Sequence, residues 1–291
     1  YKTNGFLGGA GAIADDGTLY FPASDDFLRA FGPAPAPDPG AAPSAQNWPL
    51  FGRYFDKTGL ASAAVDAAPV LQFAVKPILY GDTRTPVVGP DPDGGGPLVG
   101  SVYYTAGRYL VASDGDTGMV KWTYDLGATG APFGYAAPAV GQDGVVYVAG
   151  QDGVLHAVLD NGATYTVRWT YDFGFYTIAN ASPVIGPNGM IYVVEYAGAT
   201  RLHAIYSGGQ YSWTRIVELG VSTGTTSPAI DDNGTPATYT DDSIFIGGSS
   251  LRKVNANTGA VVWASPTTGA GASGAINGTP VIHNGVVYAL N

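Results

Sequence analysis

The chain has 291 residues, of which 43 are Gly and 21 are Pro, about a fifth of the total. This share is roughly twice the usual one and excludes a protein built mainly from long helices. Charged residues make up only 12% and apolar residues 45%, which indicates a folded chain with a substantial core. Because there is no Cys, disulfide bonds, thiolate metal sites and cysteine nucleophiles are excluded.

The formal charge is -10, from 13 basic and 23 acidic residues, and the basic residues form no cluster. A nucleic-acid partner is therefore not expected, because binding to phosphates needs a basic surface. No apolar run is long enough for a membrane span. Low Lys content with abundant Gly, Thr and Tyr favours an extracytoplasmic location: secreted, cell-surface or periplasmic. Since the chain begins at Tyr1 and not at Met, we expect it to be processed or truncated.

A strand-turn-strand unit recurs along the chain. Most copies begin with a short apolar strand led by Pro, continue through an Asp-Gly or Asn-Gly turn, and end in a second strand with a central aromatic residue. This pattern is typical of a β-hairpin. The copies lie at residues 12–20, 85–103, 137–148, 182–193, 227–245 and 279–288, the second and fifth with longer turns.

A third strand and then a fourth strand with Trp follow most of these hairpins. The Trp residues recur at intervals of 44 to 50 residues, which is the period of a four-stranded propeller blade. The sequence thus predicts an all-β propeller of four-stranded antiparallel blades, in which the four Trp pack between neighbouring blades. They are Trp122, Trp169, Trp213 and Trp263. About six blades begin, at Ile13, Val87, Ala139, Val184, Ala229 and Val281, and the last is incomplete.

We expect residues 1–291 to form one domain with a Pro/Ala-rich surface insert at about residues 32–46. Trp48 follows the insert. It is either the displaced fourth-strand Trp of the first blade or a plug between blades.

These repeats carry a family resemblance. Thr-Gly-x-x-x-Trp at residues 117–122 and 258–263, the Ser/Thr-Pro leader of the hairpins, and Trp48-Pro-Leu-Phe-Gly with Thr58-Gly59 resemble the PQQ-like, quinoprotein-type β-propeller repeat proteins. The resemblance extends over about residues 10–291. It implies a propeller fold, and a family that contains quinone-dependent dehydrogenases, assembly scaffolds related to the lipoprotein BamB, and many exported proteins.

Among these relatives, the dehydrogenases hold pyrroloquinoline quinone and calcium, with a catalytic Asp and often a vicinal Cys pair. This chain has no Cys and no recognisable calcium-binding set, so we expect no cofactor and no enzymatic activity. Gly269 to Gly274 satisfies the dinucleotide pattern G-x-G-x-x-G, but no helix is expected to follow it, which favours a linker between blades.

The three His residues and the acidic turns are weak candidates for chemistry. His156 and His203 occupy one slot of consecutive repeats, which favours packing over metal binding, and His283 is expected in a hairpin turn. Asp114 and Asp116 are the best calcium candidates, yet they lack the spacing of a calcium loop. Three sequons offer glycosylation sites, at Asn180, Asn233 and Asn277.

The incomplete last blade suggests how the protein works. Its second strand is predicted to expose an apolar assembly edge, to which Lys2 to Leu7 is a candidate donor strand. The alternative is that the sequence is part of a longer chain, whose residues beyond Asn291 complete the blade. The function favoured is a non-enzymatic scaffold that contacts other protein chains, with head-to-tail assembly of its own copies into a surface polymer or fibre as one form. The alternatives are a fragment of a quinone- and calcium-dependent dehydrogenase and a carbohydrate-binding propeller. The edge residues are Val286, Val287, Tyr288 and Leu290.

Overall fold

The structure is a computed structural model, and the observations below concern the residues that it describes. These are residues 11–14, 18–22, 27–32, 70–75, 85–90, 100–127, 136–141, 143–150, 152–174, 181–196, 199–219, 226–235, 238, 240–265, 276, 278–283 and 285–289. Within these ranges the chain forms 22 strands and no helix, so none that could cross a membrane.

The strands form five four-stranded antiparallel sheets and one two-stranded sheet, each built from consecutive strands. We call each sheet a blade and number the blades in chain order. The first contains β1 (Ala12–Ile13), β2 (Leu19–Pro22), β3 (Leu28–Gly32) and β4 (Val70–Val75). The second contains β5 (Val87–Val88), β6 (Ser101–Ala106), β7 (Tyr109–Asp114) and β8 (Val120–Asp125). The third contains β9 (Ala139–Val140), β10 (Val145–Ala149), β11 (Val154–Asp160) and β12 (Tyr165–Asp172). The fourth contains β13 (Val184–Ile185), β14 (Ile191–Tyr196), β15 (Ala199–Ile205) and β16 (Tyr211–Leu219). The fifth contains β17 (Ala229–Asp231), β18 (Ser243–Ile246), β19 (Arg252–Asn255) and β20 (Val261–Ala264), and the sixth β21 (Val281–His283) and β22 (Val286–Tyr288).

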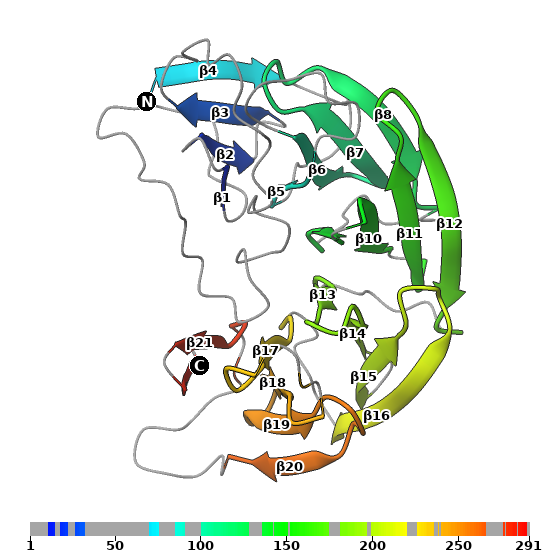
Figure 1. Ribbon diagram of the computed structural model, residues 1–291, viewed down its shortest axis with the longest axis vertical. Coiled ribbons are helices and arrows are strands. Elements are labelled where there is room, and N and C mark those ends of the chain that lie inside the picture. The colour runs from blue at the N-terminus through cyan, green and yellow to red at the C-terminus, as the bar shows by residue number, and fades with distance from the viewer. Residues whose placement is uncertain are drawn as a thin grey trace.

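The blades follow one another around an arc, with their first strands toward the centre and their fourth strands on the outside (Figure 1). The short first strands of neighbouring blades contact each other, as β5 contacts β9 and β17 contacts β21. This arrangement is that of a β-propeller, and the predicted all-β propeller fold is confirmed.

Tight turns explain why each hairpin forms where the sequence predicts it. Between β9 and β10, Gly144 has a φ of 76°, a left-handed conformation that favours glycine, and the Asp143 carboxylate accepts a hydrogen bond from the Val145 N–H at 3.2 Å. Gly189 and Asn188 repeat this turn between β13 and β14.

The core lies between the blades and not within any one of them. Each sheet has apolar side chains on both faces, so neighbouring blades must stack to bury them. One cluster shows this, since Val158 of the third blade packs with Trp122 and Tyr103 of the second. Tyr20, Tyr103, Tyr147 and Tyr192 sit near the centres of the second strands and are buried almost completely.

A chain of hydrogen bonds joins the residues that precede Pro at the start of the blades. The Ala137 N–H donates to the Ser182 hydroxyl at 2.9 Å, and the Ser182 N–H donates to the Ser227 hydroxyl at 2.8 Å. The Ser227 N–H then donates to the Thr279 hydroxyl at 3.1 Å. The recurring Ser/Thr-Pro dipeptides therefore connect one blade to the next, a role that the sequence did not reveal.

Some sequence predictions fall outside these ranges. The insert at about 32–46 lies there except for Gly32, as does Trp48, so the single-domain assignment stays a prediction. The fourth strand of the first blade is β4, which does not contain Trp48. The alternative that Trp48 occupies that strand is therefore wrong.

Candidate functional site

The four predicted Trp occupy one register position. Each lies opposite a third-strand residue of its own blade, next to a shift in strand register, and faces the aromatic side chain of its second strand with ring centroids about 6 Å apart. The aromatic pairs are Tyr103 with Trp122, Tyr147 with Trp169, Tyr192 with Trp213, and Phe245 with Trp263.

Three of these indoles also donate a hydrogen bond to the following blade. The acceptor always lies at one repeat position, where the third strand of that blade ends, and in the first blade the Tyr20 hydroxyl uses the same position. Each bond fixes one blade on the next. The bonds join Tyr20 to the Gly115 carbonyl at 2.8 Å, Trp122 to the Asp160 carboxylate at 2.8 Å, Trp169 to the Ser207 carbonyl at 2.7 Å, and Trp213 to the Ala256 carbonyl at 3.2 Å.

Trp263 departs from the predicted packing between blades. Its side chain is 41% exposed, against 6% for Trp122 and 7% for Trp213. The physical reason is that the sixth blade has only β21 and β22 in the part of the chain that the structure describes, so no third strand lies over this indole there. Val261 and Val262 on β20 are exposed as well.

The predicted assembly edge lies on β22. Val286 and Tyr288 are exposed, whereas Val287 packs against the cluster formed by Ala229, Phe245 and Ile282. Leu290 lies outside the described residues, as does the proposed donor segment at residues 2–7. Among the described strands only β21 pairs with β22.

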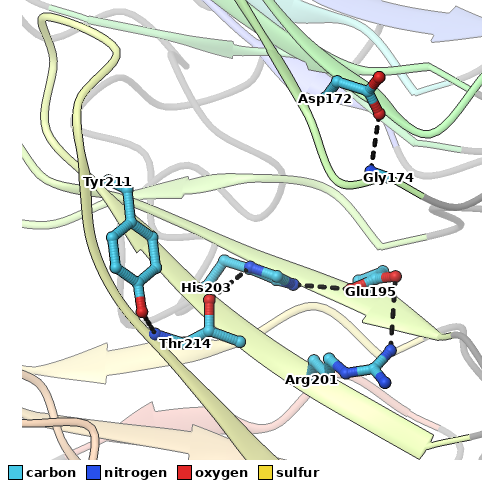
Figure 2. Close-up of polar contacts among 7 residues, drawn as sticks. All are labelled: Asp172, Gly174, Glu195, Arg201, His203, Tyr211 and Thr214. Carbon is cyan, nitrogen blue, oxygen red and sulfur yellow. Dashed lines mark hydrogen bonds and ion pairs between the residues drawn. The ribbon is translucent and has the colours of Figure 1, made fainter.

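His203 lies in a polar cluster buried between the third and fourth blades (Figure 2). Its Nε2 is 2.8 Å from the Glu195 carboxylate, and its Nδ1 is 2.8 Å from the Thr214 hydroxyl. The Arg201 guanidinium is 3.6 Å from the other Glu195 oxygen, which balances the buried negative charge. The Phe173 ring packs over the imidazole at 4.7 Å between centroids.

The cluster has the hydroxyl-imidazole-carboxylate order of a nucleophilic triad, but its geometry favours a structural role. The Thr214 N–H, which could otherwise stabilise an oxyanion, donates to the Tyr211 hydroxyl at 3.0 Å. Glu195 is 1% exposed and His203 5% exposed, so neither side chain is open to a substrate. At the nearby end of β12, the Asp172 carboxylate caps the Gly174 N–H (Figure 2).

His156 occupies the equivalent slot of the third blade. Its Nδ1 is 3.0 Å from the Tyr124 hydroxyl, and its Nε2 is 3.3 Å from the Asp152 carboxylate. Both His residues are thus buried as predicted, but each also faces a carboxylate, which the packing interpretation missed. His283 is the last residue of β21 and is exposed. It pairs with Val286 and so closes the predicted hairpin turn.

Asp242 is a buried carboxyl beside an acidic loop. It is 1% exposed, and one of its oxygens lacks a hydrogen-bond partner in the described structure. Burial, together with the charges of Asp241, Asp232 and Asp231, raises the pKa of Asp242 to about 6.

The calcium candidates serve a turn. The Asp114 carboxylate accepts hydrogen bonds from the Thr117 N–H at 2.8 Å and the Thr117 hydroxyl at 2.6 Å, while Asp116 is exposed. Asn255 makes the same turn with Thr258 in the fifth blade, where an amide replaces the carboxylate. No group of three or more His, Asp or Glu suited to a metal ion occurs within the described ranges.

Of the three sequons, only Asn233 lies in the described chain; Asn180 and Asn277 lie outside it. Asn233 is exposed in a turn with a φ of 54°, and its amide donates to the Asp241 carbonyl at 2.6 Å. Glycosylation of these sites stays a prediction.

The repeated blades with their Trp contacts define a β-propeller of PQQ-like repeats. Residues 106–291, more than half of the chain, match the family described as outer membrane protein assembly factor BamB. The chain belongs to this family.

Solved structures with the same fold include BamB and two dehydrogenases. BamB from Moraxella catarrhalis is similar over 96% of this chain and 68% of its own, with a TM-score of 0.55 and 14% identity. The quinohemoprotein alcohol dehydrogenase ADHIIG from Pseudomonas putida HK5 is similar over 84% of this chain and 44% of its own, with a TM-score of 0.55 and 18% identity. A europium-containing methanol dehydrogenase gives a TM-score of 0.59 at 12% identity, over 91% of this chain and 52% of its own.

A curated relative, mitochondrial distribution and morphology protein 10 from Pyricularia oryzae, is 33% identical over 120 residues. This similarity covers 38% of the chain, which spans only a quarter of the length of that relative.

Proposed function

We propose that the chain is a non-enzymatic, extracytoplasmic propeller that acts as a scaffold by binding other protein chains. The observation that carries this proposal is that large apolar side chains are exposed on two strands near the end of the chain: Val262 and Trp263 on β20, and Val286 and Tyr288 on β22. Exposed apolar side chains, together with an edge of β22 that no described strand pairs with, favour contact with another chain. The family relationship to BamB, whose name describes protein assembly, supports this function.

A neighbouring copy of the chain is one candidate partner, and head-to-tail contact would then produce a fibre or a closed ring. Sedimentation velocity over a wide concentration range tests this form of the function. We expect species larger than the monomer for the native chain and fewer of them after Val286→Asp. A strictly monomeric native chain would argue against self-assembly while leaving a different protein partner possible, and cross-linking in the native source would then identify contacts at β20 and β22.

The absence of enzymatic activity is part of the proposal. The support is chemical: the chain has no Cys, and the buried Glu195–His203 pair is occupied by contacts within the protein. Incubation with pyrroloquinoline quinone and calcium, followed by a dye-linked alcohol or sugar assay, tests it. Saturable quinone binding with turnover would overturn the scaffold proposal and show that the chain is a fragment of a dehydrogenase.

Carbohydrate binding is a second candidate, favoured by exposed tyrosines near the turns between third and fourth strands. Tyr206 and Tyr211 are both about half exposed on the fourth blade. A glycan array tests this candidate, with Tyr211→Ala as the matched variant.

A further inference from the structure

The turn between the third and fourth strands of the fourth blade, residues 206–211, exposes two tyrosines. Tyr206 and Tyr211 are 50% and 52% exposed, and the residues between them are Ser-Gly-Gly-Gln. No residue of this turn is charged. The turn thus combines two aromatic rings with side chains that donate and accept hydrogen bonds.

The third blade holds this turn in one shape. The Trp169 indole donates to the Ser207 carbonyl at 2.7 Å, and its ring lies against Gly209. Gly209 has a φ of 86°, and a Cβ at this residue would lie 2.7 Å from Cδ2 of Trp169, so glycine is required there. A neighbouring blade therefore fixes a turn whose tyrosines remain exposed.

Hydrogen bonds within the fourth blade fix the backbone of Tyr206 and the hydroxyl of Tyr211. The Tyr206 N–H donates to the Gln210 carbonyl at 2.9 Å, and the Gly209 N–H donates to the Tyr206 carbonyl at 2.8 Å. The Tyr211 hydroxyl accepts a hydrogen bond from the Thr214 N–H at 3.0 Å (Figure 2). A ligand that packs on these rings meets a preformed surface, so little conformational entropy is lost on binding.

The equivalent turns of the other described blades lack this combination. In the third blade, Tyr165 packs against Trp122 and Tyr124, with ring centroids 5.3 and 5.4 Å apart. The turn of the second blade, residues 114–119, contains two Asp residues, and that of the fifth, residues 255–260, contains no aromatic residue. The exposed pair of tyrosines is therefore not a requirement of the repeat.

We propose that residues 206–211 form a binding site for a neutral oligosaccharide, in which Tyr206 and Tyr211 pack on sugar rings. The C–H faces of a pyranose are apolar and fit an aromatic ring, while its hydroxyls exchange hydrogen bonds with the side chains of Ser207 and Gln210. This inference rests on the second candidate function, carbohydrate binding, and assigns its site and its class of ligand.

Charge and size favour a neutral sugar as the occupant. An anionic polysaccharide would find no cation in the turn and would be repelled by the formal charge of -10 of the chain. A specific protein interface needs about 20 to 30 residues on each side. A short turn with two aromatic rings instead matches the size of a few sugar units.

The test uses the full chain and neutral hexasaccharides as probes: cellohexaose, xylohexaose, mannohexaose and maltohexaose. Isothermal titration calorimetry measures binding, with hexagalacturonate as the anionic comparison. We expect saturable binding of at least one neutral probe, and binding of hexagalacturonate that is at least about tenfold weaker.

Variants of the chain then locate the site. We expect Tyr206→Ala and Tyr211→Ala each to weaken binding about tenfold, whereas Tyr288→Ala, which removes an exposed tyrosine from another blade, leaves it unchanged. Gly209→Ala should also weaken binding, because it displaces the turn from Trp169 while both tyrosines remain. Near-UV circular dichroism shows whether each variant is folded, and Tyr206→Ala decides alone if Tyr211→Ala is not.

Absence of saturable binding to every neutral probe at about 5 mM sugar, or equal binding to the Tyr206→Ala chain, would overturn the inference. Preferential binding of hexagalacturonate, or a protein partner cross-linked to the turn in the native source, would overturn it too. Sugar binding that no variant weakens would keep carbohydrate binding as a function and remove only this site. The scaffold proposal fails separately, when neither sedimentation nor cross-linking finds a protein partner.

Discussion

The Trp122 indole and the Asp160 carboxylate, 38 residues apart in the sequence, form a 2.8 Å hydrogen bond across the boundary between the second and third blades. The Tyr103 and Ser101 hydroxyls donate to the other Asp160 oxygen at 2.7 and 2.9 Å. Asp160 is 4% exposed, so these donors replace water around a buried charge. One carboxylate thus joins two strands of one blade to the third strand of the next.

Replacing this carboxylate should strongly destabilise the fold. Asp160→Ala leaves buried donors without an acceptor, and we expect a loss of about 3 to 5 kcal/mol in the free energy of unfolding. Urea denaturation followed by near-UV circular dichroism measures it. Asp125→Ala, at an exposed site, is the control. A loss below about 1 kcal/mol would show that the donors find water instead.

The Trp series should separate buried from exposed positions. Trp213→Ala removes a buried ring and its bond to Ala256, so we expect a loss of about 3 to 5 kcal/mol. Trp169→Ala should cost a similar amount, because Trp169 packs on Tyr147 and bonds to Ser207. Trp263→Ala should cost about 1 kcal/mol or less. Thermal unfolding of the three variants gives this order, and equal losses would refute the proposed difference at the last blade.

The Ser/Thr-Pro leaders allow a conservative comparison. Ser182→Ala removes the acceptor of the buried Ala137 N–H, with an expected loss of about 1 to 3 kcal/mol and faster amide exchange at Ala137. Ser182→Thr keeps a hydroxyl, as Thr279 does in the sixth blade, and should retain most of the protection. Unchanged exchange at Ala137 in the Ala variant would contradict the role assigned to the hydroxyl.

Asp242 should make stability depend on pH. Because its folded-state pKa of about 6 lies above the ordinary value of 3.8, the folded protein binds this proton more tightly than the unfolded chain. The stabilisation of the fold by protonated Asp242 is therefore fully present below about pH 4 and is lost as the pH rises through 6. Asp242→Asn should add about 1 to 2 kcal/mol at pH 7.5 and almost nothing at pH 4. Asp241→Asn is the control, and a gain that does not change with pH would count against this account.

The fold was predictable because its signals are local. An Asp-Gly turn such as Asp143-Gly144 and a Trp at a fixed distance from its turn lie within a few residues of each other, so they survive in the sequence as repeats. The exposure of Trp263 was not predicted from the sequence. It depends on a strand of the next blade, and the sequence pattern alone placed all four Trp alike.

The polar contacts were harder to predict because their partners are far apart in the sequence. Asp160 ends an apolar strand and looks like a turn residue, while its donors lie 38 to 59 residues earlier. One signal was available for Glu195. Ile191, Val193 and Glu195 alternate along one strand and so lie on the same face. A charged residue on this apolar, buried face needs a partner of opposite charge or a hydrogen-bond donor.

The hydroxyl chain from Ala137 to Thr279 bears on how such a protein can change in length. Suppose residues 182–226 were deleted: the Ala137 N–H would then meet the Ser227 hydroxyl, and the Trp169 N–H would meet the Ala256 carbonyl in place of that of Ser207. Each of these two hydrogen bonds would be replaced by one of the same chemistry. These bonds specify what a neighbouring blade must offer but not how many blades there are, so they place no limit of their own on the gain or loss of whole repeats.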